Sequence, residues 1–229
     1  MLIGRSWMIG TTIAIGTAVL LYFLPLFHVV PLSAKNAASS GDSSQLGTAA
    51  IGQAPQSIFE SKAFVNEFWR QRLLPGSSDA VDASNLIDAI ARDPREARKT
   101  YGRSVSVGSV YYYFIKGMGR VVSVEKNSIG LAIQDGQSRI QVSLEAGPIF
   151  GNAVRDGTGL LDLNNFANSQ DFNAVSSEIN RRIESDVQPM LRKFATMDAK
   201  ILFVGCVEVT DESIDLQPLR VVPFIAESL

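Results

Sequence analysis

The sequence predicts an α+β protein: an N-terminal transmembrane helix, a helical hairpin, and a small five-stranded β-barrel with a long helix between its third and fourth strands. Three observations predict this class. An uncharged apolar segment opens the chain, apolar side chains then recur at helical spacing, and short β-rich runs follow around one long amphipathic segment. We divide the chain into an anchor (1–32), a flexible linker (33–57) and an extracytoplasmic domain (58–229), which is helical over 58–102 and a barrel over 105–229.

The segment from Trp7 to Leu32 is uncharged and long enough to cross a hydrocarbon core about 30 Å thick. Arg5 precedes it and Lys35 is the next charge, which favours a helix with its N-terminus in the cytoplasm and the rest of the chain in the periplasm. A cleaved secretory signal is the alternative, but its apolar core is usually about 7–15 residues long. We therefore expect an uncleaved single-pass anchor in the inner membrane.

Charge, cysteine and histidine exclude several classes of function. The exported part carries 20 Lys+Arg (21 less Arg5) against 23 Asp+Glu, so it lacks the positive charge that nucleic acid requires. The single cysteine, Cys206, rules out an intramolecular disulfide and lipid attachment behind the anchor, and its apolar neighbours predict a buried side chain. His28, inside the anchor, is the only histidine, which excludes Ser-His-Asp, Cys-His and Cys/His zinc sites beyond it. We expect no metal and no cofactor.

Residues 33–57 are rich in Ala, Ser, Gly and Gln, a composition typical of a flexible linker. A first helix follows, ended by Leu74–Ser78, then a second over Ser84–Ala91 and a further turn after Asp93-Pro94. We expect a hairpin that packs on the sheet or faces a partner. The apolar face of the first helix consists of Phe59, Phe64, Val65, Phe68, Trp69 and Leu73.

The barrel strands are predicted from β-rich runs. Gly117-Met118-Gly119 predicts a bend or bulge within the first strand, and Asp135-Gly136 predicts a tight hairpin turn between the second and third. A helix over Phe172–Phe194 carries a buried stripe that includes Val187 and Met190, and Pro189 is expected to kink it. The order of elements is that of an OB-like barrel. Its strands are Tyr111–Ile115 with Arg120–Val124, Ile129–Gln134, Arg139–Leu144, Lys200–Val209 and Ile214–Val222.

Polar residues cluster after the third strand and before the long helix. An Arg guanidinium grips carboxylates in bidentate fashion, and Asn and Gln side chains suit sugar hydroxyls. A structural alternative stays open, in which Arg155 and the Asn-rich loop hydrogen-bond the barrel rim and cap the helix that begins near Asp171. The candidate ligand- or partner-binding residues are Gly147, Pro148, Gly151, Arg155, Asp156, Asn165, Asn168 and Gln170.

Three segments, Gly117–Val122, Gly147–Asp156 and Asn164–Phe172, resemble the family of predicted periplasmic lipoproteins called domain of unknown function 2291. The likeness covers the chain from Ile58 onward and includes Glu67-Phe68-Trp69, Asp93-Pro94 and Tyr101-Gly102. Members are often encoded beside sugar-uptake ABC transporters, so the resemblance implies an accessory role in solute uptake. The chain departs from the family pattern because it has no lipobox cysteine, and because Ala153–Gly157 reads Ala-Val-Arg-Asp-Gly where Ala-Leu-Arg-Asp-Ala is usual.

Two functions follow as hypotheses. The first is a non-enzymatic, membrane-anchored periplasmic module that binds an ABC transporter component, another envelope protein or a small ligand. The second is a carboxylate-based hydrolase or lyase, which a pocket formed by Arg155, Asp156 and Asn168 would support, with Asp156 and Asp162 as an acid and base pair. The Tyr111–Tyr113 run either stacks on sugar rings or fills the core.

Overall fold

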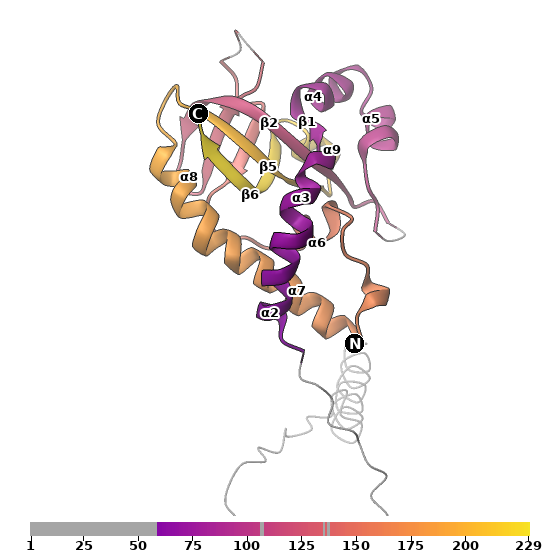
Figure 1. The fold of residues 1–229 in the computed structure, drawn as a ribbon. Helices are drawn as coiled ribbons and strands as arrows, with labels where there is room; N and C mark the ends of the chain where they lie inside the picture. Colours follow the sequence, from indigo (N-terminus) through magenta and orange to yellow (C-terminus); the bar gives the residue numbers. More distant parts are fainter. Residues whose placement is uncertain (1–58, 106–107, 135, 137) are drawn as a thin grey trace, which may run out of the picture. The chain divides into compact units, whose positions relative to one another are not determined.

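The computed structural model describes residues 59–105, 108–134, 136 and 138–229, which form a mixed sheet flanked by helices (Figure 1). The predicted anchor and the linker over 33–57 lie outside the described residues. Within the described ranges, no helix has both the length and the apolar character that a bilayer crossing requires.

Six strands form one sheet in the order β1-β2-β3-β4-β6-β5, and β2 also pairs with β5, which brings the sheet round into a ring. Pairs β1–β2 and β4–β6 are parallel, and the others are antiparallel. Apart from the two-residue β1, the strand order and the helix between β4 and β5 are those of the predicted OB-like barrel. The strands are β1 (Val81–Asp82), β2 (Tyr111–Val124), β3 (Ser128–Ala132), β4 (Val142–Glu145), β5 (Lys200–Val209) and β6 (Leu219–Ser228).

Strand β2 is long enough to pair with two neighbouring strands along its length. It pairs with β5 over Tyr111–Arg120 and with β3 from Arg120 onward. The irregular register lies between Val121 and Ser123, so the bend or bulge expected at the two glycines is displaced toward the β3 pairing. Gly117 instead permits close packing, because a Cβ there would lie 2.9 Å from the Cβ of Ala83.

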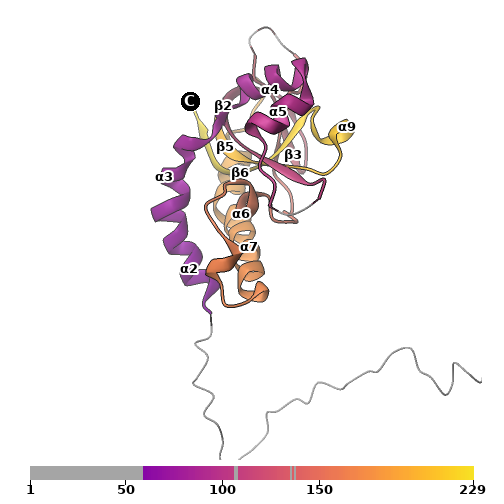
Figure 2. The same cartoon turned by 90° about the vertical axis from the view of Figure 1, so that its right-hand side faces the viewer.

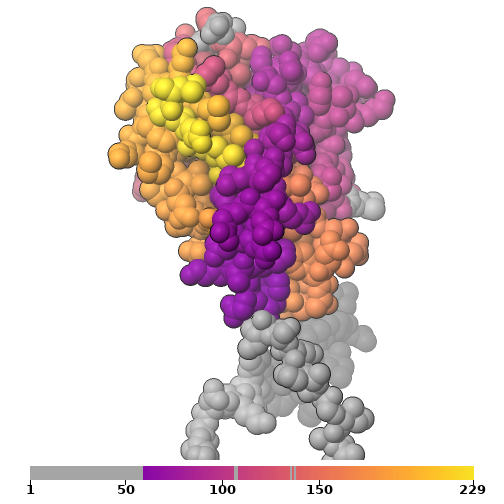
Figure 3. Space-filling model, viewed as in Figure 1, coloured from indigo at the N-terminus to yellow at the C-terminus, as the bar shows by residue number. Residues whose placement is uncertain are grey.

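Strands β5 and β6 are buried on both faces, which explains their nearly continuous apolar sequences. Phe203 and Val207 point into the ring, whereas Val204 and Cys206 belong to a second core outside it. The outer core lies beneath the N-terminal helix, where Trp69 meets Phe224 edge to face with ring centroids 6.2 Å apart. In Figure 3 this helix, coloured indigo, covers the face between the C-terminal strands and the orange part of the chain.

The N-terminal helix is continuous through α2 (Ser61–Phe68), the π-helical turn η1 (Trp69–Leu73), α3 (Leu74–Gly76) and the 3₁₀ turn η2 (Ser77–Asp79). Helices α4 (Ala83–Arg92) and α5 (Pro94–Tyr101) follow, each begun by an aspartate whose side chain accepts backbone N–H groups. The prediction that the first helix pairs with the second in a hairpin is wrong. The first helix packs along α7, and α4 packs on α5 beside β2 (Figure 2), because β1 separates them and joins the sheet.

The long helix comprises α7 (Ser169–Arg182), the π-helical turn η4 (Ile183–Val187) and α8 (Gln188–Phe194). The π turn accommodates Pro189, which has no N–H to donate and whose ring needs room near the preceding turn. The extra residue rotates the buried face, so Gln188 and Leu191 are buried and Met190 is 52% exposed. The expected burial of Met190 is therefore wrong.

Two predicted strand boundaries also move. Strand β3 ends at Ala132 and β4 begins at Val142, so both strands stop short of the expected hairpin turn, of which Asp135 and Gln137 lie outside the described residues. In the 133–141 loop that connects them, the side chain of Gln141 accepts the backbone N–H groups of Ile133 and Gln134. Gly136 in this loop has the expected positive φ, +77°. The last strand begins at Leu219 rather than Ile214, since residues 212–215 form the short helix α9 (Glu212–Asp215).

Candidate functional site

The segment that follows β4 is held against the long helix along its length. Gly147 accepts a 2.7 Å hydrogen bond from the Gln188 side chain, and the Ile149 N–H donates to Glu184 at 2.7 Å. Gly151, with φ +83°, accepts hydrogen bonds from Ser176 and Asn180 on α7. The backbone of the segment is therefore fixed, and the chain enters α6 (Ala153–Gly157), which packs on β5.

Arg155 and Asp156 form a buried, bidentate ion pair on α6. Nε and Nη2 of Arg155 donate to the two carboxylate oxygens of Asp156 at 2.7 and 3.0 Å, and both side chains are 7% exposed. Nη1 donates to the backbone carbonyl of Phe172 and to the side chain of Asn173, and the guanidinium lies over the Phe172 ring at 4.0 Å. The pair joins α6 to the start of α7, whereas the structural alternative raised from the sequence placed the hydrogen bonds of Arg155 at the barrel rim.

The Asn-rich loop has a structural role as well. Asn168 caps α7 by accepting the Asp171 N–H at 2.8 Å, and Asn165 ends the 3₁₀ turn η3 (Leu163–Asn165). Gln170 is exposed in the first turn of α7, and Asn165 and Asn168 are exposed too. Arg155 and Asp156 are brought together, but Asn168 binds the helix end instead of joining them.

The side chains of Tyr111–Tyr113 and of Cys206 are all buried. Tyr111 and Tyr113 point into the ring and are 1% and 0% exposed, so they fill the core. The hydroxyl of Tyr112 faces Asp156 at 3.5 Å, and burial together with the charges of Glu208 and Asp156 raises the pKa of Tyr112 to about 12. Cys206 is buried as expected, and burial raises the pKa of its thiol.

An open cleft of about 370 Å³ lies between the segment after β4 and the outer side of β4, β6 and β5. A second hollow of about 580 Å³ lies on the α7 side of the same segment. Phe150 borders both and is 85% exposed, the most exposed of the large apolar side chains in the described part of the chain. Gly151 also lines both hollows, and Pro148 lines the first. The other residues of the first cleft are Glu145, Ile149, Ala153, Glu208, Thr210, Asp215, Arg220 and Val222.

Three carboxylates and one arginine give the cleft its charge. Arg220 donates to Glu145 at 3.0 Å. Burial alone would raise the pKa of Asp215, but the backbone N–H groups of Asp211 and Thr210 and the Thr210 hydroxyl lower it. Glu208 differs, because burial, followed by the charge of Asp156, raises its pKa against the opposing effect of the Asn152 backbone. The cleft is acidic overall.

Glu208 provides a prediction with a defined sign. A carboxyl whose pKa is higher in the folded state keeps its proton longer there, so its contribution to stability falls as pH rises through the interval above its ordinary pKa. We expect Glu208→Gln to be more stable than the wild type near pH 7 and equally stable below about pH 4, where both side chains are uncharged. Urea unfolding at the two pH values measures this. Equal stability at neutral pH would contradict it.

Sequence reasoning missed Glu208, Arg220 and Asp215. Glu208 had a usable signal, since it alternates with Val207 and Val209 on β5 and so lies on the outer face of the ring. Arg220 and Asp215 had no such signal. The final strand was predicted to begin at Ile214, and tertiary contacts determine how residues 146–152 cross β6. Within the described ranges, no three His, Cys, Asp or Glu side chains are placed to hold a metal ion.

A crystal structure of an OB-fold protein from Thermotoga maritima is similar to the chain, with a TM-score of 0.67 and 22% identity over 75% of this chain and 99% of that one. This likeness shows the fold alone. No curated protein matches the chain. The sequence model of the family described as predicted periplasmic lipoprotein (DUF2291) matches residues 17–227, and the chain belongs to that family.

Proposed function

We propose that this protein is a non-enzymatic periplasmic module that binds a protein partner through the Phe150 surface, meaning Phe150 and the two hollows on either side of it. The observation that carries the proposal is an 85% exposed phenylalanine on a backbone segment that hydrogen bonds hold in place. Exposed aromatic side chains that enter a partner's pocket supply much of the binding energy of protein interfaces. A fixed segment also loses little conformational entropy on binding.

The chemistry of this surface favours a partner with an apolar pocket rimmed by positive charge. Phe150 would fill the pocket, while Glu208 and Asp215 in the adjoining cleft would face the cationic rim. Such complementary charge mainly increases the association rate and the specificity. Among envelope proteins we propose a component of an ABC-type sugar uptake system, the partner that the family resemblance implies.

Membrane attachment through the apolar segment over 7–32 belongs to the same proposal. A lipoprotein carries its lipid on a cysteine, and the one cysteine of the printed chain, Cys206, is buried within β5. A transmembrane helix supplies an anchor without it. The composition of residues 33–57 suits a tether that lets the folded part reach a membrane-bound partner.

The alternative function is a hydrolase or lyase, but the first residues proposed for its catalysis, Arg155 and Asp156, are engaged with each other. Arg155 makes four hydrogen bonds within the protein, and the Asp156 carboxylate is held by that guanidinium. Glu208 is the remaining acid with a raised pKa in a cleft. If the protein is a hydrolase or lyase, the wild type should turn over a small or sugar-like substrate and Glu208→Gln should abolish that activity. If it is a binding module, the wild type should show no such activity.

Capture from membranes tests the proposed interaction. The full chain carries an affinity tag, and a crosslinker is added before solubilisation. We expect Phe150→Ser to recover at least tenfold less transporter component than the wild type, since loss of a central aromatic contact costs about 2 kcal/mol or more. The matched control is Met197→Ser, which removes an apolar side chain that is 59% exposed beyond the other end of β5. Equal recovery by both variants would overturn the assignment of Phe150.

A further inference from the structure

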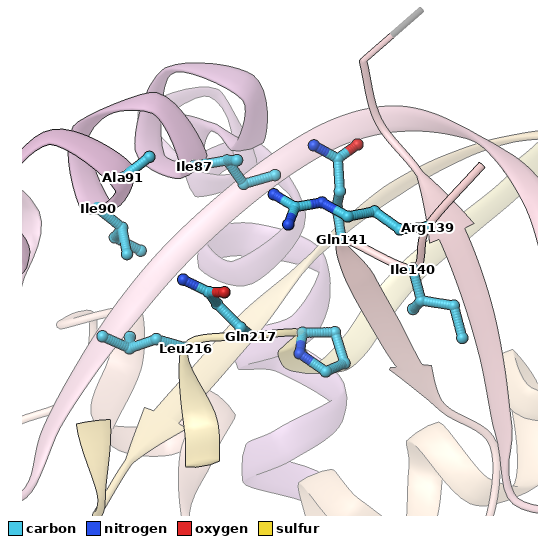
Figure 4. A pocket seen from close by; sticks show the side chains of 9 residues that line it. Ile87, Ile90, Ala91, Arg139, Ile140, Gln141, Leu216 and Gln217 are labelled. Carbon is cyan, nitrogen blue, oxygen red and sulfur yellow. The ribbon is translucent and has the colours of Figure 1, made fainter. Parts of the chain in front are cut away.

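A separate pocket of about 190 Å³ lies where α4, the 133–141 loop and residues 216–218 meet (Figure 4). It shares no lining residue with the hollows beside Phe150. Its apolar walls are formed by Ile87 and Ile90 of α4, Ile140 of the loop, and Leu216 and Pro218, and the polar residues Arg139, Gln141 and Gln217 also line it.

One charged side chain, Arg139, lines this pocket. Figure 4 shows its guanidinium extending across the space toward α4, with the Gln217 side chain directed into the same space from the opposite side. Within the described part of the chain, Arg139 has neither a hydrogen-bond partner nor an ion-pair partner. The exposed Arg139 side chain therefore borders the pocket, and no carboxylate is among the described residues that line it.

The loop that carries Arg139 is held in place by Gln141. The Gln141 side chain is 5% exposed; its oxygen accepts the N–H groups of Ile133 and Gln134, and its Nε2 donates to the Gln134 side chain at 3.0 Å. Gln134 in turn donates to Asp88 of α4 at 2.7 Å. The loop is thus tied to α4, and the two sides of the pocket are fixed relative to each other.

We propose that this pocket binds a small organic monocarboxylate with a branched or aromatic apolar body. Arg139 would hold the carboxylate with paired N–H donors, the geometry that a guanidinium offers to this group. The size fits, because a cavity of about 150 Å³ accommodates benzene and this one is about 190 Å³. A single cation among the described lining residues disfavours phosphate, which needs more donors. The isoleucine, leucine and proline side chains match the apolar body of such a monocarboxylate.

Titration calorimetry on the full chain in detergent tests this proposal, with phenylacetate and 4-methylpentanoate as probes. We expect saturable millimolar or tighter binding, and at least tenfold weaker binding of phenylacetamide, which has the same shape without the charge. Inorganic phosphate is expected neither to bind nor to compete. Absence of saturable binding by both carboxylates, equal affinity for the amide, or displacement by phosphate would each overturn the proposal.

Single-residue variants test whether the carboxylate binds in this pocket. Arg139→Gln is expected to weaken phenylacetate binding at least tenfold, and the matched control, Arg95→Gln on the exposed start of α5, to leave it unchanged. Ala91→Trp places a ring in the pocket from an exposed position of α4 while Arg139 remains, and it should abolish binding. Unfolding midpoints near that of the wild type establish that the variants fold. Wild-type affinity in both pocket variants would contradict the assigned location.

Discussion

Replacing Arg155 with alanine is expected to lower the free energy of unfolding by about 3–5 kcal/mol, the usual cost of removing one partner of a buried ion pair. The Asp156 carboxylate, whose side chain is 7% exposed in the wild type, would lose its two hydrogen bonds from Arg155. The hydrogen bonds to Phe172 and Asn173, and the contact with the Phe172 ring, would be lost as well. Urea unfolding of the wild type and the variant at neutral pH measures the difference.

The control for Arg155 is another arginine next to a carboxylate, on the surface. Arg181 pairs with Glu178 on α7 and its side chain is 55% exposed, so Arg181→Ala should change stability far less than Arg155→Ala does. Adding Asp156→Asn to Arg155→Ala should recover part of the loss, because the unpaired buried charge is then removed. A loss below about 1 kcal/mol in the single variant would show that water reaches Asp156 and that the pair does not join α6 to α7.

Gly205→Ala is expected to destabilise the fold by about 3 kcal/mol or more, the upper end for inserting one carbon into a packed site. A Cβ at this position would lie within 3 Å of three atoms: the Val222 carbonyl oxygen, a Val221 methyl group and the Cα of Pro223. Two of these are backbone atoms, so strand β6 itself must move. The position lies at the register shift between β5 and β6, where the backbones approach closely.

Gly108→Ala provides the control for Gly205, because no atom of the described residues lies within 4 Å of a Cβ at that glycine. Its effect should stay within about 0.5 kcal/mol. Thermal unfolding of the two variants under one set of conditions separates steric conflict from the general effect of replacing glycine. Similar midpoints for both would contradict the close approach of β5 and β6.

Local sequence signals predicted the elements whose residues decide their own structure. The apolar run of β5, the first helix and the β-rich segments were readable because burial on two faces and an apolar helix face leave direct patterns. The order of these elements was enough to predict the ring of strands. The shift of the buried face at η4 was not readable, since a π turn changes the period without changing the composition.

The site was less predictable because tertiary contacts determine it. Arg155 and Asp156 were recognised as a pair, but only the fold decides whether they face a pocket or the start of α7. Phe150 carries no signal in the sequence that separates it from a core phenylalanine, and its exposure results from the hydrogen bonds that fix its neighbours. Arg139 was assigned to a strand, whereas Gln141 holds its segment as a loop.

A photo-crosslinking amino acid at position 150 tests the central claim most directly. The full chain is produced in its native membrane, and the same crosslinker is placed at position 197 for comparison. The proposal predicts that illumination links position 150, and not position 197, to a transporter component that mass spectrometry identifies. Identical adducts at both positions, or no protein adduct at position 150, would contradict the claim that the Phe150 surface binds a partner.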